Sequence, residues 1–164
     1  MDVCLVDKCY RNLVSMCIEN KKYYINGEGI TNNSIWKEAF TFALSLIMND
    51  NSIERIVFYF SAKEKIEVWF DKEKDKNLIN RLWEGMQDAE RNSVTYCAKT
   101  ERTYKKDDVY NDIIISLGCG SSILKDLDKH EMVRYIIAVP WQLCLIDEWI
   151  KENNVPMIEF ENIK

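Results

Sequence analysis

The chain has 164 residues, of which 47% are hydrophobic and 12% aromatic, and its formal net charge is −5. This length and apolar content predict one domain spanning residues 1–164 and exclude an intrinsically disordered chain. Asp and Glu are interleaved with most of the Lys and Arg residues, which disfavours a nucleic-acid binder that depends on phosphate contacts.

The six cysteines predict free thiols rather than a disulfide framework or a zinc site. They form no C-x-x-C pair, whereas structural zinc sites use closely spaced ligands. No stretch approaches the roughly 18 apolar residues of a membrane-spanning helix, and the first residues lack the pattern of a signal peptide. We therefore expect a cytoplasmic protein with no metal site and no membrane partner.

The first part of the chain predicts two helices around a short strand. Apolar residues recur at helical spacing over residues 2–19 and again over 35–48, where Asn33 or Ser34 is the expected N-cap. Residues 22–25 between them are a short strand candidate. Both helices are expected to pack on the same sheet.

Residues 53–60, with the sequence IERIVFYF, predict a strong strand. A run this apolar is typical of a strand that is covered on both faces. Residues 61–64 then show a capping-box pattern, and the apolar residues within 62–70 recur at helical spacing, which favours a helix. The same apolar residues also alternate, so a hairpin strand remains the alternative for 62–70.

The rest of the chain alternates helices and strands. An amphipathic pattern predicts a helix over residues 75–91. The elements expected after it are a strand over 93–99, a loop or extended edge over 100–108, strands over 112–117 and 133–139 with a helix over 121–129 between them, a helix over 141–152 and an edge strand over 157–160.

This alternation predicts βαβ units around a parallel sheet. We expect a three-layer α/β/α sandwich of Rossmann-like or flavodoxin-like kind, with a mostly parallel sheet of about four to six strands and the two N-terminal helices packed on it. The tryptophans at apolar helical positions are assigned to the core, and any uncovered part of this aromatic surplus would form a homodimer patch. These tryptophans are Trp36, Trp69, Trp83 and Trp149.

A glycine-rich loop, Gly118-Cys119-Gly120-Ser121-Ser122, separates a predicted buried strand from a predicted helix. In open α/β sheets, ligands bind beyond the carboxyl ends of the strands. Glycines allow close approach to the backbone, and the first amides of a helix favour an anion. The loop therefore predicts a site for a phosphate or a carboxylate. A tight turn with Ser121 as the N-cap explains the same residues without a ligand, and this alternative stays open.

The sequence SLGCGSS resembles the first motif of methyltransferases that use S-adenosylmethionine. It departs from that motif at Ser116, where an acidic residue is expected, and at Ser122, where the third glycine is expected. The dinucleotide fingerprint G-x-G-x-x-G is also incomplete, because Ile123 occupies the position of its third glycine. We therefore predict no specific cofactor.

Two further turns complete a candidate pocket. Ser61 follows the strand at 53–60, and Trp141 follows the strand at 133–139. If these strands and 112–117 are parallel neighbours, all three turns lie at one edge of the sheet. Ser61 would then offer an oxygen, and Trp141 a stacking surface for the ring of a nucleotide-like ligand. Taken singly, Ser61 is explained as a helix cap and Trp141 as a half-buried packing residue.

Cys119 is a candidate nucleophile, because a helix N-terminus lowers the pKa of a thiol. A catalytic cysteine also needs a nearby base. His130 lies at the opposite end of the helix predicted to start beside Cys119, about 13–15 Å away at 1.5 Å per residue. We therefore expect Cys119 to be a buried apolar residue.

Two functions follow from these patterns. The first is binding of a nucleotide or another anionic metabolite over residues 118–122, with Ser61 and Trp141 as further contacts. The second is a non-catalytic protein–protein interaction or homodimerisation domain in which the glycine loop is structural. An enzyme that uses Cys119 or Ser61 would require a base that the sequence does not place beside either residue.

Overall fold

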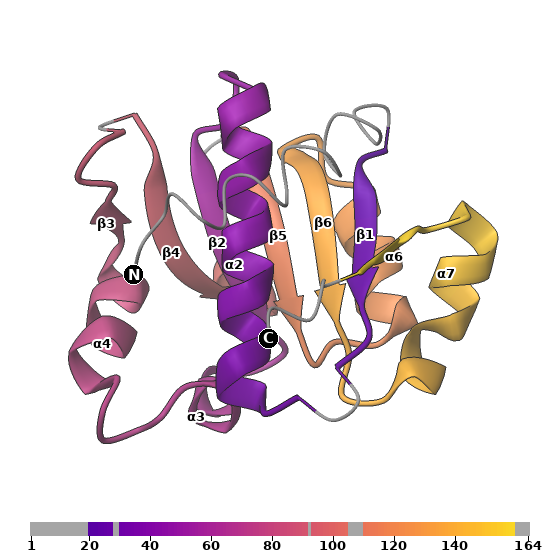
Figure 1. Cartoon of the computed structure of the whole chain (residues 1–164), viewed down its shortest axis with the longest axis horizontal. Helices are drawn as coiled ribbons and strands as arrows, with labels where there is room; N and C mark the ends of the chain where they lie inside the picture. The colour runs from indigo at the N-terminus through magenta and orange to yellow at the C-terminus, as the bar shows by residue number, and fades with distance from the viewer. Residues whose placement is uncertain (1–19, 28–29, 92, 105–109, 160–164) are drawn as a thin grey trace.

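The computed structural model describes residues 20–27, 30–91, 93–104 and 110–159. These residues form an α/β fold around one mostly parallel sheet of seven strands, in which only β3 pairs antiparallel with its neighbour (Figure 1). Across the sheet, the order is β3 (Met86–Gln87), β4 (Thr95–Thr100), β2 (Arg55–Phe60), β5 (Asp112–Leu117), β6 (Val133–Val139), β1 (Lys22–Ile25) and β7 (Met157–Ile158).

Helices cover both faces of the sheet. In Figure 1, α2 crosses in front of the sheet and α6 lies behind it. One apolar cluster joins α2, α3 and α4 to the first face, and a second joins α6 and α7 to the other. The bounds of the α-helices are α2 (Asn32–Asn49), α3 (Ile66–Trp69), α4 (Lys76–Glu84), α5 (Glu101–Tyr104), α6 (Ser121–Asp128) and α7 (Asp147–Asn153).

The three strongest predicted strands lie side by side. Every residue of β2 and β5 is buried, as their near-continuous apolar runs predict. β2, β5 and β6 pair in parallel, with Val57 opposite Ile114 and Ile114 opposite Ile136. The carboxyl ends of the three strands therefore meet at one edge, which is the arrangement that the candidate site requires.

A buried ion pair joins the opposite, amino-terminal ends of β2 and β5. Arg55 and Asp112 are register partners, and both guanidinium-to-carboxylate contacts are short, 2.8 Å and 2.7 Å. The Tyr104 hydroxyl donates a third hydrogen bond to Asp112, at 2.7 Å. The Asp112 carboxylate is thus satisfied inside the fold.

The predicted range of about four to six strands was wrong, because the sheet has seven. The additional strand is β3, which lies inside the helix predicted over residues 75–91. Gly85 adopts a positive φ of 89°, which ends α4 at Glu84. The chain then reverses, and Met86 pairs with Tyr96 of β4.

Only one of the two expected N-terminal helices lies within the described residues, so the predicted pair is not matched. α2 corresponds to the prediction over 35–48 but begins earlier. Its N-cap is Thr31, whose hydroxyl oxygen accepts a hydrogen bond from the Ser34 N–H, so the expected cap at Asn33 or Ser34 was wrong. The helix predicted over 2–19 lies outside the described residues.

Three other ambiguous or approximate predictions are resolved. The stretch 62–70 is helical, as a 3₁₀ turn η1 (Lys63–Lys65) followed by α3, and the expected capping box does not form because Ala62 is the N-cap of η1. The predicted loop or edge over 100–108 contains the helical turn α5. The helix expected over 141–152 starts later, as a 3₁₀ turn η2 (Leu143–Ile146) that continues into α7.

Candidate functional site

The turns after β2, β5 and β6 lie at the carboxyl-end edge of the sheet. Ser61 follows β2 and is exposed, the Gly118–Ser122 loop follows β5, and Trp141 follows β6 and is 46% exposed. The structure thus brings the predicted site residues to one edge. It gives them different surroundings, and these decide what each can do.

Gly118 packs beneath two tryptophans. Its φ is +76°, and its N–H donates to the Val139 carbonyl at 2.8 Å. A Cβ at this position would lie 2.9 Å from Trp141 Nε1 and 3.3 Å from Trp69 Cζ2. Both the backbone conformation and the close approach therefore require glycine, and its absent side chain lets Trp141 and Trp69 come together over the turn.

Cys119 is buried, as predicted, and its chemistry is that of an unreactive thiol. Its Sγ lies 3.9 Å from the Leu117 carbonyl oxygen and 4.0 Å from that of Tyr59. Burial raises the pKa of the Cys119 thiol to about 11. The helix N-terminus beside it therefore does not produce a reactive thiolate.

We expect iodoacetamide at neutral pH to label the exposed Cys144 and to leave Cys119 unlabelled in the folded protein. Burial blocks access to Cys119, and its raised pKa leaves little thiolate. Peptide mass spectrometry of native and denatured samples measures both sites, with the denatured sample as the control for labelling. Rapid modification of Cys119 in the native protein would contradict this assignment.

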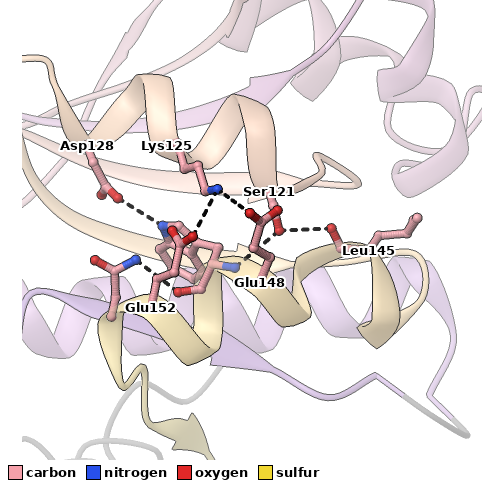
Figure 2. A network of polar contacts seen from close by, with 8 residues as sticks. Ser121, Lys125, Asp128, Leu145, Glu148 and Glu152 are labelled. Carbon is pink, nitrogen blue, oxygen red and sulfur yellow. Dashed lines mark hydrogen bonds and ion pairs between the residues drawn. The ribbon is translucent and has the colours of Figure 1, made fainter.

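The Ser121 hydroxyl joins α6 to the segment that follows β6 (Figure 2). It donates to the Leu145 carbonyl at 3.2 Å and accepts from the Trp149 N–H at 3.3 Å. Ser122 is exposed. Gly120 is the N-cap of α6, and a Cβ there would meet only the Leu145 carbonyl, at an ordinary 3.7 Å. Ser121 therefore has a structural partner on each side, while Ser122 remains at the surface.

The same contact surface carries a network of charges that Figure 2 shows between α6 and α7. Lys125 Nζ lies 2.8 Å from a carboxylate oxygen of Glu148 and 3.3 Å from one of Glu152. Its hydrogen bond with Glu148 raises the pKa of Lys125 and lowers the pKa of Glu148. These groups pair with one another, so the network explains the packing of α6 on α7 rather than a ligand site.

A pocket of about 90 Å³ opens beside these turns, between the ends of β1 and β6 and the start of α2. Of the site residues predicted from the sequence, it includes Trp141 alone. The others that matter were missed, because no local pattern shows that β1 lies next to β6. They are Asn26, Gly27, Ile30, Asn32 and Trp69.

Trp69 gives this pocket an unsatisfied hydrogen-bond donor. Its side chain is 2% exposed, and its indole N–H has no acceptor among the described residues. Its ring lies 5.0 Å from that of Trp141, centroid to centroid. A buried N–H without a partner is costly, so an acceptor on a bound molecule would stabilise it.

The start of α2 adds further donors at the same pocket. The first amides of a helix have no acceptor within the helix, and their dipoles favour a negative group. Asn32 lines the pocket at this point, and its side-chain amide donates to the Val68 carbonyl at 3.3 Å. The pocket therefore combines hydrogen-bond donors with aromatic rings, a combination that suits an acidic group attached to an apolar or planar body.

No protein-family model, curated protein or solved structure matches the chain. Among the residues that the structure describes, no three His, Cys, Asp or Glu side chains gather closely enough to hold a metal ion. None of the helices in these ranges combines the length and apolarity needed to cross a bilayer. The function is therefore argued from the geometry of the carboxyl-end edge.

Proposed function

We propose that the protein binds a small anionic metabolite, such as a nucleotide, at the carboxyl-end edge of its sheet. The acidic group enters the pocket beside Trp69, and a planar part of the ligand lies against Trp141. The Gly118–Ser122 loop supports this site, because Gly118 holds the two tryptophans together. The unsatisfied indole N–H of Trp69 is the observation that carries the proposal.

The strand order supports this location. With β3 and β1 set aside, the order β4-β2-β5-β6-β7 is the 2-1-3-4-5 order of flavodoxin-like sheets. We infer a three-layer α/β/α sandwich of that kind, with β1 inserted between β6 and β7. In such folds ligands bind at the carboxyl ends of the strands, near the point where the strand order reverses. Here the order reverses between β2 and β5.

The size of the pocket restricts what enters it. A cavity of about 150 Å³ accepts benzene, so one of about 90 Å³ suits a carboxylate or a phosphate group. The remainder of a larger ligand must lie outside, where Trp141 is exposed. The pocket would therefore select the acidic group, and Trp141 the body of the ligand.

The three described cysteines are free thiols, which suits a reducing compartment. We accordingly propose a cytoplasmic location.

Inorganic phosphate, acetate and adenosine 5′-monophosphate are the probes for this site. We expect saturable binding of at least one probe at millimolar concentration, seen as a rise in Tm and a change in tryptophan fluorescence. At 100 times its Kd, a ligand adds about 2.7 kcal/mol to the stability. Trp69→Phe removes the N–H and keeps an aromatic ring, so it should weaken binding about fivefold to tenfold, the loss expected for one hydrogen bond.

Trp83→Phe is the matched control, because Trp83 is half-buried and lies outside the pocket. It should leave the affinity for each probe unchanged. If none of the probes binds, or if the two variants weaken binding equally, the proposal is wrong.

Association with another protein or a second copy is the alternative, and one observation favours it. Ile30, Val68, Trp141 and Leu145 are all exposed apolar residues. Ile30 and Trp141 line the pocket, Asn32 bonds Val68, and Ser121 bonds Leu145, so the four lie at or beside the same edge. A dimer detected by light scattering and dissociated by Leu145→Ser would favour association over ligand binding.

A further inference from the structure

We infer a second binding site, for an aromatic or short acyl carboxylic acid, in an apolar cavity on the other side of α2. The cavity measures about 240 Å³ and lies between α2, α4 and the β3-β4-β2 side of the sheet. Its walls include Trp36 and Phe40 of α2, Phe58 of β2, Leu82 of α4 and Tyr96 of β4. This site is distinct from the carboxyl-end pocket and does not depend on it.

The size and lining of the cavity select the body of the ligand. An apolar cavity of about 150 Å³ accepts benzene, so this larger one accommodates a bicyclic ring or a short acyl chain. Phe40 and Phe58 stack with ring centroids 5.8 Å apart, and Tyr96 meets Phe40 edge to face at 5.1 Å. The Tyr96 hydroxyl donates to Asp88, so it is the Tyr96 ring, with its polar end already bonded, that contributes to the wall.

Two donors in this otherwise apolar lining select the polar end of the ligand. Trp36 is 7% exposed, and its indole N–H has no acceptor among the described residues. Lys37 is exposed and also lines the cavity, which places a cation at its mouth. Its Nζ lies 5.7 Å from the centre of the Trp36 ring. A carboxylate would accept from the indole and pair with the ammonium, whereas an amine would be repelled.

The probe is 2-naphthoate, with neutral 2-naphthylmethanol and cationic 2-naphthylmethylamine as comparisons of the same size. Isothermal titration calorimetry of the full chain should show saturable binding in the order acid, alcohol, amine. Lys37→Gln should weaken the acid roughly tenfold and leave the alcohol unchanged, because it removes only a charge-assisted contact.

Lys63→Gln is the matched control, since Lys63 also lies over a tryptophan, Trp83 at 5.6 Å, but is not part of the cavity. It should not alter the binding of any probe. Leu78→Trp tests the location, because Leu78 is a half-buried lining residue and the larger ring would fill the cavity and abolish binding.

Three results would overturn the inference: no binding of 2-naphthoate, equal affinities for acid and alcohol, or binding that survives in a folded Leu78→Trp protein. A dimer that Leu78→Trp dissociates would also overturn it, because a second copy of the chain would then occupy the cavity. Failure of this site would leave the carboxyl-end proposal unaffected, since phosphate binding and the Trp69→Phe effect are measured separately.

Discussion

Asp112→Ala is expected to lower the free energy of unfolding by about 3–5 kcal/mol, the effect of removing one partner from a buried ion pair. Asp112 is fully buried, and Arg55 is 6% exposed. The variant removes the carboxylate that accepts from both the Arg55 guanidinium and the Tyr104 hydroxyl. The remaining charge stays in a low-dielectric interior without this counter-ion, which is why the expected loss exceeds that of a surface pair.

Urea denaturation monitored by tryptophan fluorescence measures this loss. Lys125→Ala is the matched control, because it removes an ion pair whose partners Glu148 and Glu152 are exposed, and its effect should be much smaller. The double variant Arg55→Leu with Asp112→Leu should recover part of the stability, since no buried charge remains. If Asp112→Ala costs no more than Lys125→Ala, the pair does not stabilise the fold as described.

The same pair shows which features of the fold could be predicted from the sequence. The apolar runs over residues 53–60 and 112–117 identified two buried strands, because burial on both faces leaves a local mark on composition. Their charged ends left no comparable mark. Arg55 and Asp112 are 57 positions apart and meet only because the register of β2 against β5 places them opposite each other.

The limits of the helix predictions have a similar cause. Apolar spacing over 75–91 is helical throughout, yet the helix stops at Gly85, where a positive φ and the pairing of β3 with β4 outweigh the local pattern. Residues 62–70 became helical although they also alternate. In both stretches, tertiary contacts decided between structures that the sequence alone allowed.

The candidate site was predicted in its location but not in its composition. The three neighbouring strands place Ser61, the glycine loop and Trp141 at one edge, as expected from parallel order. The donors come from elsewhere, from Trp69 and the start of α2, which flank the pocket because β1 lies beside β6. The prominent loop instead shapes the site: Gly118 admits the tryptophans, Cys119 is buried, and Ser121 is bonded to the segment after β6.

This division of roles predicts a second large effect, in which Trp149→Ala lowers the free energy of unfolding by about 3–5 kcal/mol. Trp149 is fully buried in the cluster that joins α6 and α7 to the sheet. Its indole N–H donates to Asp128 at 2.9 Å, and its backbone N–H donates to the Ser121 hydroxyl at 3.3 Å. The substitution leaves a large cavity and an unsatisfied carboxylate oxygen between the two helices.

Trp141→Ala is the matched control, because Trp141 is 46% exposed and its ring packs on Trp69 at the surface. Thermal and urea denaturation should show a small loss for Trp141→Ala and a large one for Trp149→Ala. Adenosine 5′-monophosphate binding should respond in the opposite way, with the larger loss in folded Trp141→Ala. Equal losses of stability in the two variants would mean that the contact of α6 with α7 does not hold this side of the sheet, and that Ser121 is not tied there for structural reasons.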